Sequence, residues 1–389
     1  NGHIVYGAHN KATRDSSLAI GNSNEATAGA ATAIGVWSKA RGNASIAMGN
    51  VAMATATNAI AIGNRANSNA ANQELTSGEN SIAIGTQSNA GGGDSIAIGR
   101  QSTTNSVNTV TIGAETKATG GYAVAIGRES EVNANFATAM GYQSKAKGSA
   151  SIAIGKQNNS NLGDTITMGN SNTANTMGGI AIGKNNIADS SIGDPTTANK
   201  ENSQIAIGRD NVATHLDTIA IGRETKATGS GATVIGARAE ASGDNSIAIG
   251  QSGKGSPKVI ASGVNSIAIG MQSQATGEAA IAEGAGSRAG GKYGVALGRT
   301  TKANAEAATA LGNAAEANIA NGVALGSSSV TTTDKGVKGY NPSDDHTRHY
   351  TNLANNVRTA TTAAVSIGNG STLTRQLTGL AAGTADTDA

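Results

Sequence analysis

Along most of the chain, large aliphatic and small residues alternate in short segments that each end in glycine and recur every fourteen residues. The typical segment is Ile-Ala-Ile-Gly. Its 22 closing glycines are Gly7, Gly21, Gly35, Gly49 and Gly63, then every fourteenth residue from Gly85 to Gly183, from Gly208 to Gly250 and from Gly270 to Gly326. Alternation with a period of two predicts a β-strand. A fixed longer period predicts a solenoid, in which each coil buries its apolar face against its neighbours.

The two faces of this strand carry different side chains. Counted from the closing glycine as position 0, positions −1 and −3 are mostly Ile, Val or Leu, position −2 is mostly Ala, and position −4 is often Ser. Because successive side chains point to opposite faces, we expect the aliphatic face to form the core and the small Ala/Ser face to be an oligomer interface. The predicted structural core includes Ile82, Ile84, Ile96, Ile98, Ile152, Ile154, Ile247 and Ile249, with turn glycines Gly85, Gly99, Gly155 and Gly250.

The rest of each repeat predicts a second strand and two turns. Position +5 is usually Ala, and position +7 is often Gly, as at Gly42, Gly120 and Gly148. Fourteen residues suffice for two strands of about five residues and two tight turns, with coils stacked ~4.8 Å apart. We expect the glycines to supply the positive φ that the turns need. The flattened β-roll has a thin core, so we expect an obligate oligomer with rolls side by side.

Three interruptions break the period, near residues 72–79, 190–200 and 253–261. They are interpreted as loops extruded from single coils. Pro195 and Pro257 lie in two of them, and Pro342 lies beyond the last repeat. This distribution fits strands elsewhere, because proline cannot donate to the hydrogen bonds of a central strand. Such loops are either binding loops on a rigid scaffold or tolerated surface insertions.

The repeat Ser-Ile-Ala-Ile-Gly with a downstream Ala-x-Gly resembles the head of trimeric autotransporter adhesins of the YadA type, over about residues 1–330. Residues 331–372 resemble a head-insert motif, and residues 373–389 resemble the start of a neck. The resemblance implies an all-β, left-handed parallel β-roll of about 22 coils, assembled as a homotrimer. It also implies an extracellular fragment at the bacterial cell surface, held in the outer membrane only through a C-terminal anchor missing from this chain.

The function implied by this resemblance is adhesion without catalysis. The expected partners are a host extracellular matrix or cell-surface protein, or other bacterial cells in autoaggregation and biofilm, with avidity from three chains. An ice-binding solenoid or a purely structural spacer is the alternative. Ice binding needs a flat ladder of Thr-x-Thr, and threonines are only scattered here. A solenoid enzyme is disfavoured, since no hexapeptide period or clustered acid–base groove is present.

Composition adds several exclusions. Cysteine is absent, which excludes disulfides and thiolate chemistry. The formal net charge of +2 gives no strong field for nucleic acid. No apolar run approaches the ~20 residues of a membrane helix. Residues 344–349 (Asp-Asp-His-Thr-Arg-His) contain metal-ligating types, but their spacing matches no known ligand pattern, so we expect no metal, no cofactor and no catalytic residue.

Four residues are the candidates for ligand binding. Tyr122 and Phe136 share position −5 in successive coils and are expected to stack, either as an exposed contact patch or as packing at the roll edge. Lys117 and Lys145 belong to a recurring lysine column at position +4. That column is either a basic stripe for an acidic or fibrous ligand, or part of a mixed surface with ion pairs between neighbouring coils.

One residue breaks the aliphatic pattern. Glu283 occupies position −1, where 20 of the 22 copies have Ile, Leu or Met. Because burial of an unpaired carboxylate is costly, we expect either a local distortion or pairing with Arg288.

Overall fold

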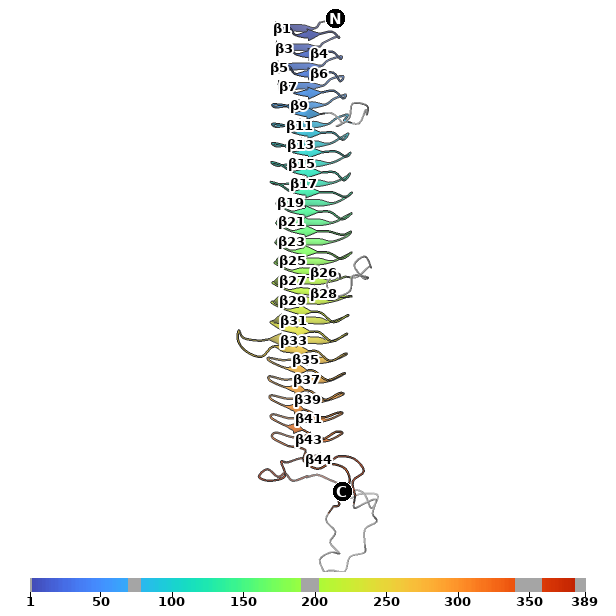
Figure 1. Cartoon of the computed structure of the whole chain (residues 1–389), viewed down its shortest axis with the longest axis vertical. Coiled ribbons are helices and arrows are strands. Elements are labelled where there is room, and N and C mark those ends of the chain that lie inside the picture. Colours follow the sequence, from blue (N-terminus) through green and yellow to red (C-terminus); the bar gives the residue numbers. More distant parts are fainter. Residues whose placement is uncertain (1, 69–77, 190–202, 340–358, 382–389) are drawn as a thin grey trace, which may run out of the picture. The chain divides into compact units, whose positions relative to one another are not determined.

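The structure, a computed structural model, describes residues 2–68, 78–189, 203–339 and 359–381 (Figure 1). It divides into two compact units, Asn1–Arg209 and Asp210–Ala389. The described residues form strands, turns and bends, and none of them belongs to a helix that crosses a membrane. Within each unit the chain forms a parallel β-roll, so the predicted fold class is confirmed.

Each coil contributes one strand to sheet A, which contains the Ile-Ala-Ile segments. In the first unit its strands are β1 (Ile4–Ala8), β3 (Leu18–Asn22), β5 (Thr32–Val36), β7 (Ile46–Asn50), β9 (Ile60–Ile62), β11 (Ile82–Ile84), β13 (Ile96–Ile98), β15 (Val110–Ile112), β17 (Val124–Ile126), β19 (Thr138–Tyr142), β21 (Ile152–Lys156), β23 (Ile166–Asn170), β25 (Ile180–Lys184) and β27 (Ile205–Arg209). In the second unit they are β29 (Ile219–Arg223), β31 (Thr233–Ala237), β33 (Ile247–Gln251), β35 (Ile267–Ile269), β37 (Ile281–Glu283), β39 (Val295–Leu297), β41 (Thr309–Leu311), β43 (Val323–Leu325) and β44 (Val365–Ser366).

Sheet B contains the second strand of each coil, which is shorter than predicted. In the first unit its strands are β2 (Lys11–Ala12), β4 (Glu25–Ala26), β6 (Lys39–Ala40), β8 (Met53–Ala54), β10 (Asn67–Ser68), β12 (Asn89–Ala90), β14 (Thr103–Thr104), β16 (Lys117–Ala118), β18 (Glu131–Val132), β20 (Lys145–Ala146), β22 (Asn159–Ser160), β24 (Thr173–Ala174) and β26 (Ile187–Asp189). In the second unit they are β28 (Val212–Thr214), β30 (Lys226–Ala227), β32 (Ala239–Ala241), β34 (Val259–Ala261), β36 (Gln274–Ala275), β38 (Arg288–Ala289), β40 (Lys302–Ala303) and β42 (Glu316–Ala317).

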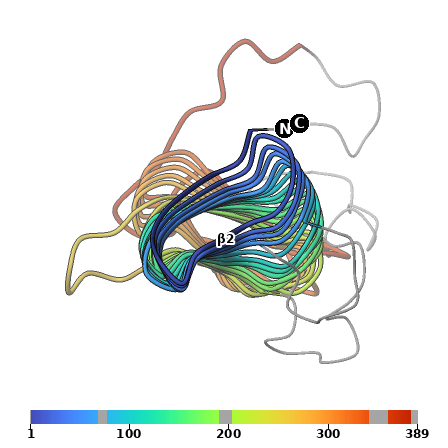
Figure 2. The ribbon, with the colours of Figure 1, turned by 90° about the horizontal axis from the view of Figure 1, so that it is seen from above.

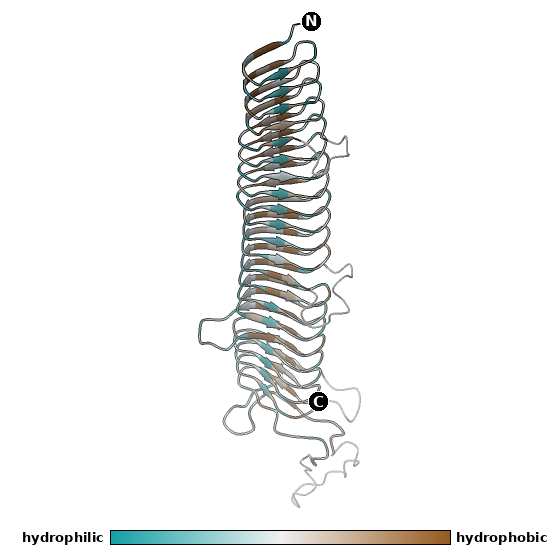
Figure 3. Cartoon of the chain, turned by 45° about the horizontal axis from the view of Figure 1, so that its top comes forward, coloured by the Kyte–Doolittle hydropathy of each residue, from teal (hydrophilic) through white to brown (hydrophobic). Residues whose placement is uncertain are grey.

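Neighbouring strands pair with an offset of one whole repeat. Ile152 of β21 lies beside Ile166 of β23, and Gly155 lies beside Gly169. Each repeat position therefore forms a column of like residues, and successive coils follow nearly the same path when seen from above (Figure 2). Apolar and polar strand residues both recur from coil to coil (Figure 3).

The interior of the roll is lined by small residues, which reverses the predicted arrangement. Ala83 of sheet A and Ala90 of sheet B are fully buried, whereas Ile82 and Ile84 are only half-buried and point outward. The prediction that the aliphatic residues form the core of the roll is therefore wrong. The same correction applies to Ile96, Ile98, Ile152, Ile154, Ile247 and Ile249.

The reason is the narrow gap between the two sheets of a coil. The hydroxyl groups of Thr104 on β14 and Ser95, which precedes β13, lie 3.1 Å apart across the interior. Likewise, a Cβ added at Gly179 would lie 3.7 Å from the Cβ of Ala174. Two short side chains fill this gap, so Ile, Leu and Met side chains occupy the outer face, and the largest aliphatic residues inside are Val132, Val234 and Val259. The Ala/Ser face is consequently buried within the chain and is not available as the predicted oligomer interface.

Interior polar groups are satisfied by ladders of side chains at position +3. The buried Asn172 amide donates to the carbonyls of Met168 (2.9 Å) and Gly183 (2.8 Å). Its Oδ1 accepts from the backbone N–H of Asn186 (3.0 Å). The closing glycine thus exposes a carbonyl to the interior, and the asparagine of the preceding coil satisfies it, as buried polar groups require.

We expect Asn172→Ala to lower the free energy of unfolding by about 1–3 kcal/mol, because it removes the side-chain partner of the Gly183 carbonyl and of the Asn186 N–H. Urea denaturation of both proteins measures this loss. Asn159→Ala is the matched control, since it removes an amide from the outer face of β22 and is expected to change stability by less than about 0.5 kcal/mol. Equal losses in the two variants would contradict the ladder's role.

The two glycine columns serve different purposes. At position 0, positive φ is confirmed, for example at Gly85 (φ 128°), Gly99 (φ 131°), Gly155 (φ 121°) and Gly250 (φ 144°). At position +7 the prediction of positive φ is wrong, because glycines such as Gly148 do not have it. A Cβ on Gly148 would instead lie 1.8 Å from the carbonyl oxygen of Leu162 in the next coil. This second column is glycine because neighbouring backbones approach closely.

The predicted insertion near residues 253–261 is shorter than expected. Residues 253–258 form an exposed loop, and Val259–Ala261 return to sheet B as β34, with Val259 fully buried. The other two predicted insertions lie largely outside the described residues. After the last coil, β44 pairs with β43, and Arg375 donates to Ser329 Oγ (2.8 Å).

The predictions for Glu283 are both wrong. Its strand β37 pairs in register, with Glu283 between Ile269 and Leu297, so no distortion occurs. Arg288 belongs to β38 in the opposite sheet, and no ion pair joins it to Glu283 in the described structure. The carboxylate is exposed because position −1 faces outward, so it needs no internal partner.

Candidate ligand-binding surface

The four predicted site residues lie on neighbouring coils of the first unit. Lys117 of β16 and Lys145 of β20 are on the outer face of sheet B. Tyr122 and Phe136 are in the turns that lead from sheet B back to sheet A. The four residues thus form two surfaces, a groove beside the lysines and a notch beside the aromatic rings.

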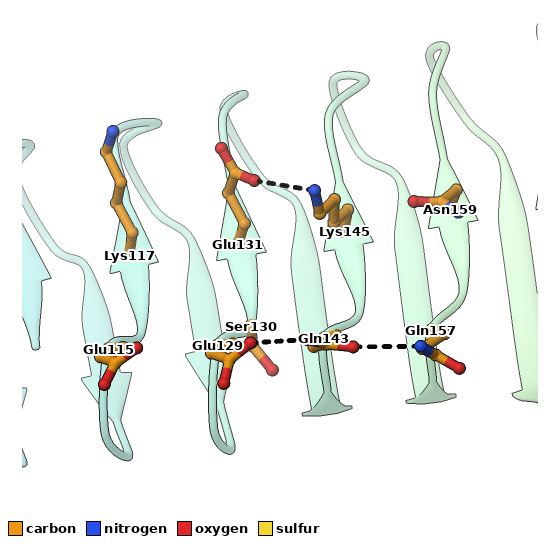
Figure 4. A pocket seen from close by; sticks show the side chains of 9 residues that line it. All are labelled: Glu115, Lys117, Glu129, Ser130, Glu131, Gln143, Lys145, Gln157 and Asn159. Atoms are coloured by element: carbon orange, nitrogen blue, oxygen red, sulfur yellow. Dashed lines mark hydrogen bonds and ion pairs between the residues drawn. The ribbon is translucent and has the colours of Figure 1, made fainter. Parts of the chain in front are cut away.

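The groove has a volume of about 550 Å³ and runs across β16, β18, β20 and β22 (Figure 4). Two rows of side chains line it, one from position +4 and one from the turn at position +2. Together with Ser130, the lining residues are Lys117, Glu131, Lys145 and Asn159 in the first row and Glu115, Glu129, Gln143 and Gln157 in the second.

Charges in the groove alternate along the coils. Glu131 lies between the two lysines, and the Nζ of Lys145 is 3.8 Å from its Oε2. The amide of Asn133 also donates to Glu131 (3.0 Å). Lys117 makes no ion pair or hydrogen bond with the described residues, and Figure 4 shows its side chain extended. Lys117 and Lys145 are therefore brought onto one face but are not a continuous basic stripe.

Side chains of the second row form hydrogen bonds from one coil to the next. Gln143 donates to Glu129 (2.6 Å), and Gln157 donates to Gln143 (3.1 Å). Arg128 also pairs with Glu129 (2.8 Å). These contacts favour the alternative prediction of a mixed surface with pairs between coils, each worth at most about 1 kcal/mol.

Similar pairs occur away from the groove. The Arg41 guanidinium hydrogen-bonds Glu25 (2.6 Å) and lowers the pKa of that carboxyl. The Glu278 carboxylate lies 2.9 Å from Lys292 and raises the pKa of that amine. Ion pairs between neighbouring coils are thus a general property of this surface and do not single out the groove.

The notch contains the aromatic pair. The rings of Tyr122 and Phe136 stack with centroids 5.3 Å apart and an interplanar angle of 16°, so the predicted stacking is confirmed. The residues are 57% and 62% exposed, which favours the contact patch over packing at the roll edge. The notch has a volume of about 390 Å³ and is lined by Gly92, Asn105, Ser106, Val107, Gly121, Tyr122, Asn135 and Phe136.

A second apolar patch was missed in the sequence. Val36, Trp37 and Val51 are exposed on adjacent coils, and the N–H of Val51 donates to the carbonyl of Val36 (2.8 Å). The chain's single Trp at position +2, with Val at the same position of the next coil, was the available signal.

No cluster of three metal-ligating residues occurs among the residues that the structure describes. The segment 344–349, considered above for metal ligation, lies outside them.

Comparison with known proteins gives one finding that covers most of the roll. The YadA head domain repeat, a unit of two copies, matches nine segments of the chain. They are residues 26–52, 77–102, 105–130, 133–158, 205–225, 227–252, 261–287, 289–315 and 303–329. These segments lie on the stacked coils and include the whole notch and the groove except for Glu131 and Asn159. A search of curated proteins gave no match.

Proposed function

The chain belongs to the family of YadA head domains, and from this we propose that it is a homotrimeric adhesive head that attaches a bacterium to host matrix, host cells or other bacteria. The family consists of non-catalytic, adhesin-type surface proteins whose heads form homotrimers and bind external targets. For this chain we propose multivalent protein binding at the cell surface, with anchorage in the outer membrane through a part of the protein beyond this chain.

The proposal that three chains assemble rests on the outward aliphatic face of sheet A. In the single chain, apolar residues at position −1 remain more than a third exposed, at Met48, Ile112, Met140, Met168, Ile235 and Leu325. Exposed apolar residues that recur on one face of a sheet are expected at an interface. Packing three such faces together would bury them and leave sheet B, with its charged columns, on the outside.

Trimeric assembly also supports attachment by weak sites. Each protomer repeats the same groove and notch, so a trimer presents three copies. Linked sites raise the apparent affinity by about 10²–10⁴ when geometry permits simultaneous binding. The low-relief surfaces described above are compatible with this mode of binding.

A binding experiment with a trimer that is held together by a fused coiled coil (the fused trimer) tests the proposal. With a trimeric coiled coil joined after Ala389, we expect saturable binding to at least one of immobilised matrix protein, host cells or beads coated with the same protein. A monomeric form of the same chain, with one copy of each surface, is expected to bind at least tenfold more weakly, because avidity is lost. A well-folded trimer that binds none of these surfaces would refute adhesion and leave the spacer alternative.

A further inference from the structure

We propose that the notch at Tyr122 and Phe136 is a binding site for a neutral glycan. One sugar ring would lie against the exposed aromatic surface, and the amides of Asn105 and Asn135 would bind its hydroxyl groups. The inference deepens the proposed function, since it rests on adhesion for the source of the glycan, a host or bacterial surface.

The polarity of the notch selects this ligand class. All eight lining residues are uncharged, so a cationic or anionic ligand finds no counter-charge there. The Asn135 Oδ1 accepts from the N–H of Gly121 (2.8 Å), which fixes the amide and leaves its NH₂ as a donor toward the notch rim. The Asn105 amide makes no hydrogen bond with other described residues and can both donate and accept.

The aromatic pair supplies the complementary apolar contact. An aromatic face is electronegative at its centre, so it attracts the weakly positive C–H groups on one face of a sugar ring. A sugar has hydroxyl groups at its rim, where the notch places amides and the Ser106 hydroxyl, which donates to the Thr119 carbonyl (2.6 Å) and can still accept. A purely apolar peptide segment would instead cover these polar groups without satisfying them, which is costly. The combination of an aromatic face and neutral amides therefore fits a glycan best.

Backbone conformation supports a functional role for both rings. Tyr122 and Phe136 adopt φ of 55° and 60°, in the left-handed region that bulky residues avoid. Other coils place better-suited residues at this position, including Asn58, Asn80, Asn108, Asn245, Asn265 and Asn321. The roll therefore does not need aromatic residues at this position, and the two rings are an addition to a turn that other coils build without them.

Tyr293 provides an internal comparison. It occupies the same repeat position with φ of 58°, and it is 49% exposed. The Nζ of Lys292 lies 4.9 Å from its ring centroid, and that amine pairs with Glu278. Its ring thus has a charged neighbour and no aromatic partner, so we expect no neutral glycan to bind at Tyr293.

The test compares two variants of the fused trimer on an array of neutral and sialylated oligosaccharides. We expect the wild type and Tyr293→Asn to bind neutral glycans, and Tyr122→Asn with Phe136→Asn to lose at least tenfold in binding. Asparagine suits the left-handed backbone, so the melting temperature of the double variant is expected to stay the same or rise. Saturation-transfer NMR with N-acetyllactosamine, a neutral disaccharide, checks that the sugar contacts the aromatic protons.

Four outcomes would overturn the inference: no neutral glycan binds, the double variant binds as well as the wild type, the double variant unfolds at lower temperature, or apolar peptides bind at the notch in place of glycans.

Adhesion to host cells before and after removal of surface glycans by glycosidases separates this inference from the proposed function. Adhesion that survives the treatment and the double substitution would refute the glycan site alone, whereas glycan binding without cell attachment would refute the adhesive role.

Discussion

We expect the paired substitution Ile152→Lys and Ile154→Lys to convert the trimer into monomers. Both side chains project from β21 on the outer aliphatic face, where they are half-buried in the single chain. Burying one such side chain contributes about 1.5–3 kcal/mol, and burying an unpaired ammonium group costs several kcal/mol more. With two substitutions in each of three chains, association is expected to weaken by at least about 10³-fold.

Sedimentation at micromolar concentration measures the change directly. Asn159→Lys in the same coil is the matched control, because position +4 on the outer face of sheet B already carries Lys at Lys117 and Lys145. This control is expected to remain trimeric. A trimer that survives the paired isoleucine substitution would place the interface on another surface and contradict our assignment of the aliphatic face.

Stability of the wild type is expected to depend on concentration for the same reason. The interior of each coil is filled mainly by Ala, Ser, Thr and Asn, which bury little apolar area. Burial of the outer face on assembly therefore supplies a large share of the folding free energy, and mass action couples folding to association.

The period of the sequence was sufficient to predict the parallel roll but not which face is the interior. Alternation tells which residues share a face of a strand, as Ile82 and Ile84 do, and says nothing about which face is enclosed. The expectation that large aliphatic residues lie inside comes from globular monomers. The alanine of the opposing strand, such as Ala90, was the signal in the sequence for a narrow interior. Two facing layers of small residues define a gap that excludes isoleucine.

The sequence could predict the candidate site only where residues at the same repeat position stack in adjacent coils. Tyr122 and Phe136 had to become neighbours because the same repeat position stacks in adjacent coils. The remainder of the notch comes from other positions, including Asn105 and Val107 of the preceding coil, whose placement depends on the turn conformation. Glu283 was misjudged for the same reason as the core, since its position faces outward.

The largest effect on the single chain is expected from Gly155→Ala. A Cβ at this residue would lie 2.1 Å from the carbonyl oxygen of Gly169 in the next coil, and the residue has φ of 121°, which L side chains rarely adopt. The clash cannot be relieved by shifting the neighbour alone. Gly169 stands in the same relation to Gly183, at 2.0 Å, so any displacement propagates along the column. We expect a loss of stability of at least about 4 kcal/mol, in the range of the most damaging single substitutions.

Gly163→Ala is the matched control, since its added Cβ would lie 3.6 Å from the backbone oxygen of Ser149, an ordinary contact. Its stability is expected to change by less than about 0.5 kcal/mol, or to rise slightly, because Ala restricts the unfolded chain. In a solenoid each coil interacts mainly with its neighbours, so the Gly155→Ala damage should be local. Amide hydrogen exchange is expected to show lost protection from β19 to β23 and retained protection in more distant coils. Equal stability of the two alanine variants would show that the coils tolerate a side chain at position 0, and it would remove the physical reason for the glycine that closes every repeat.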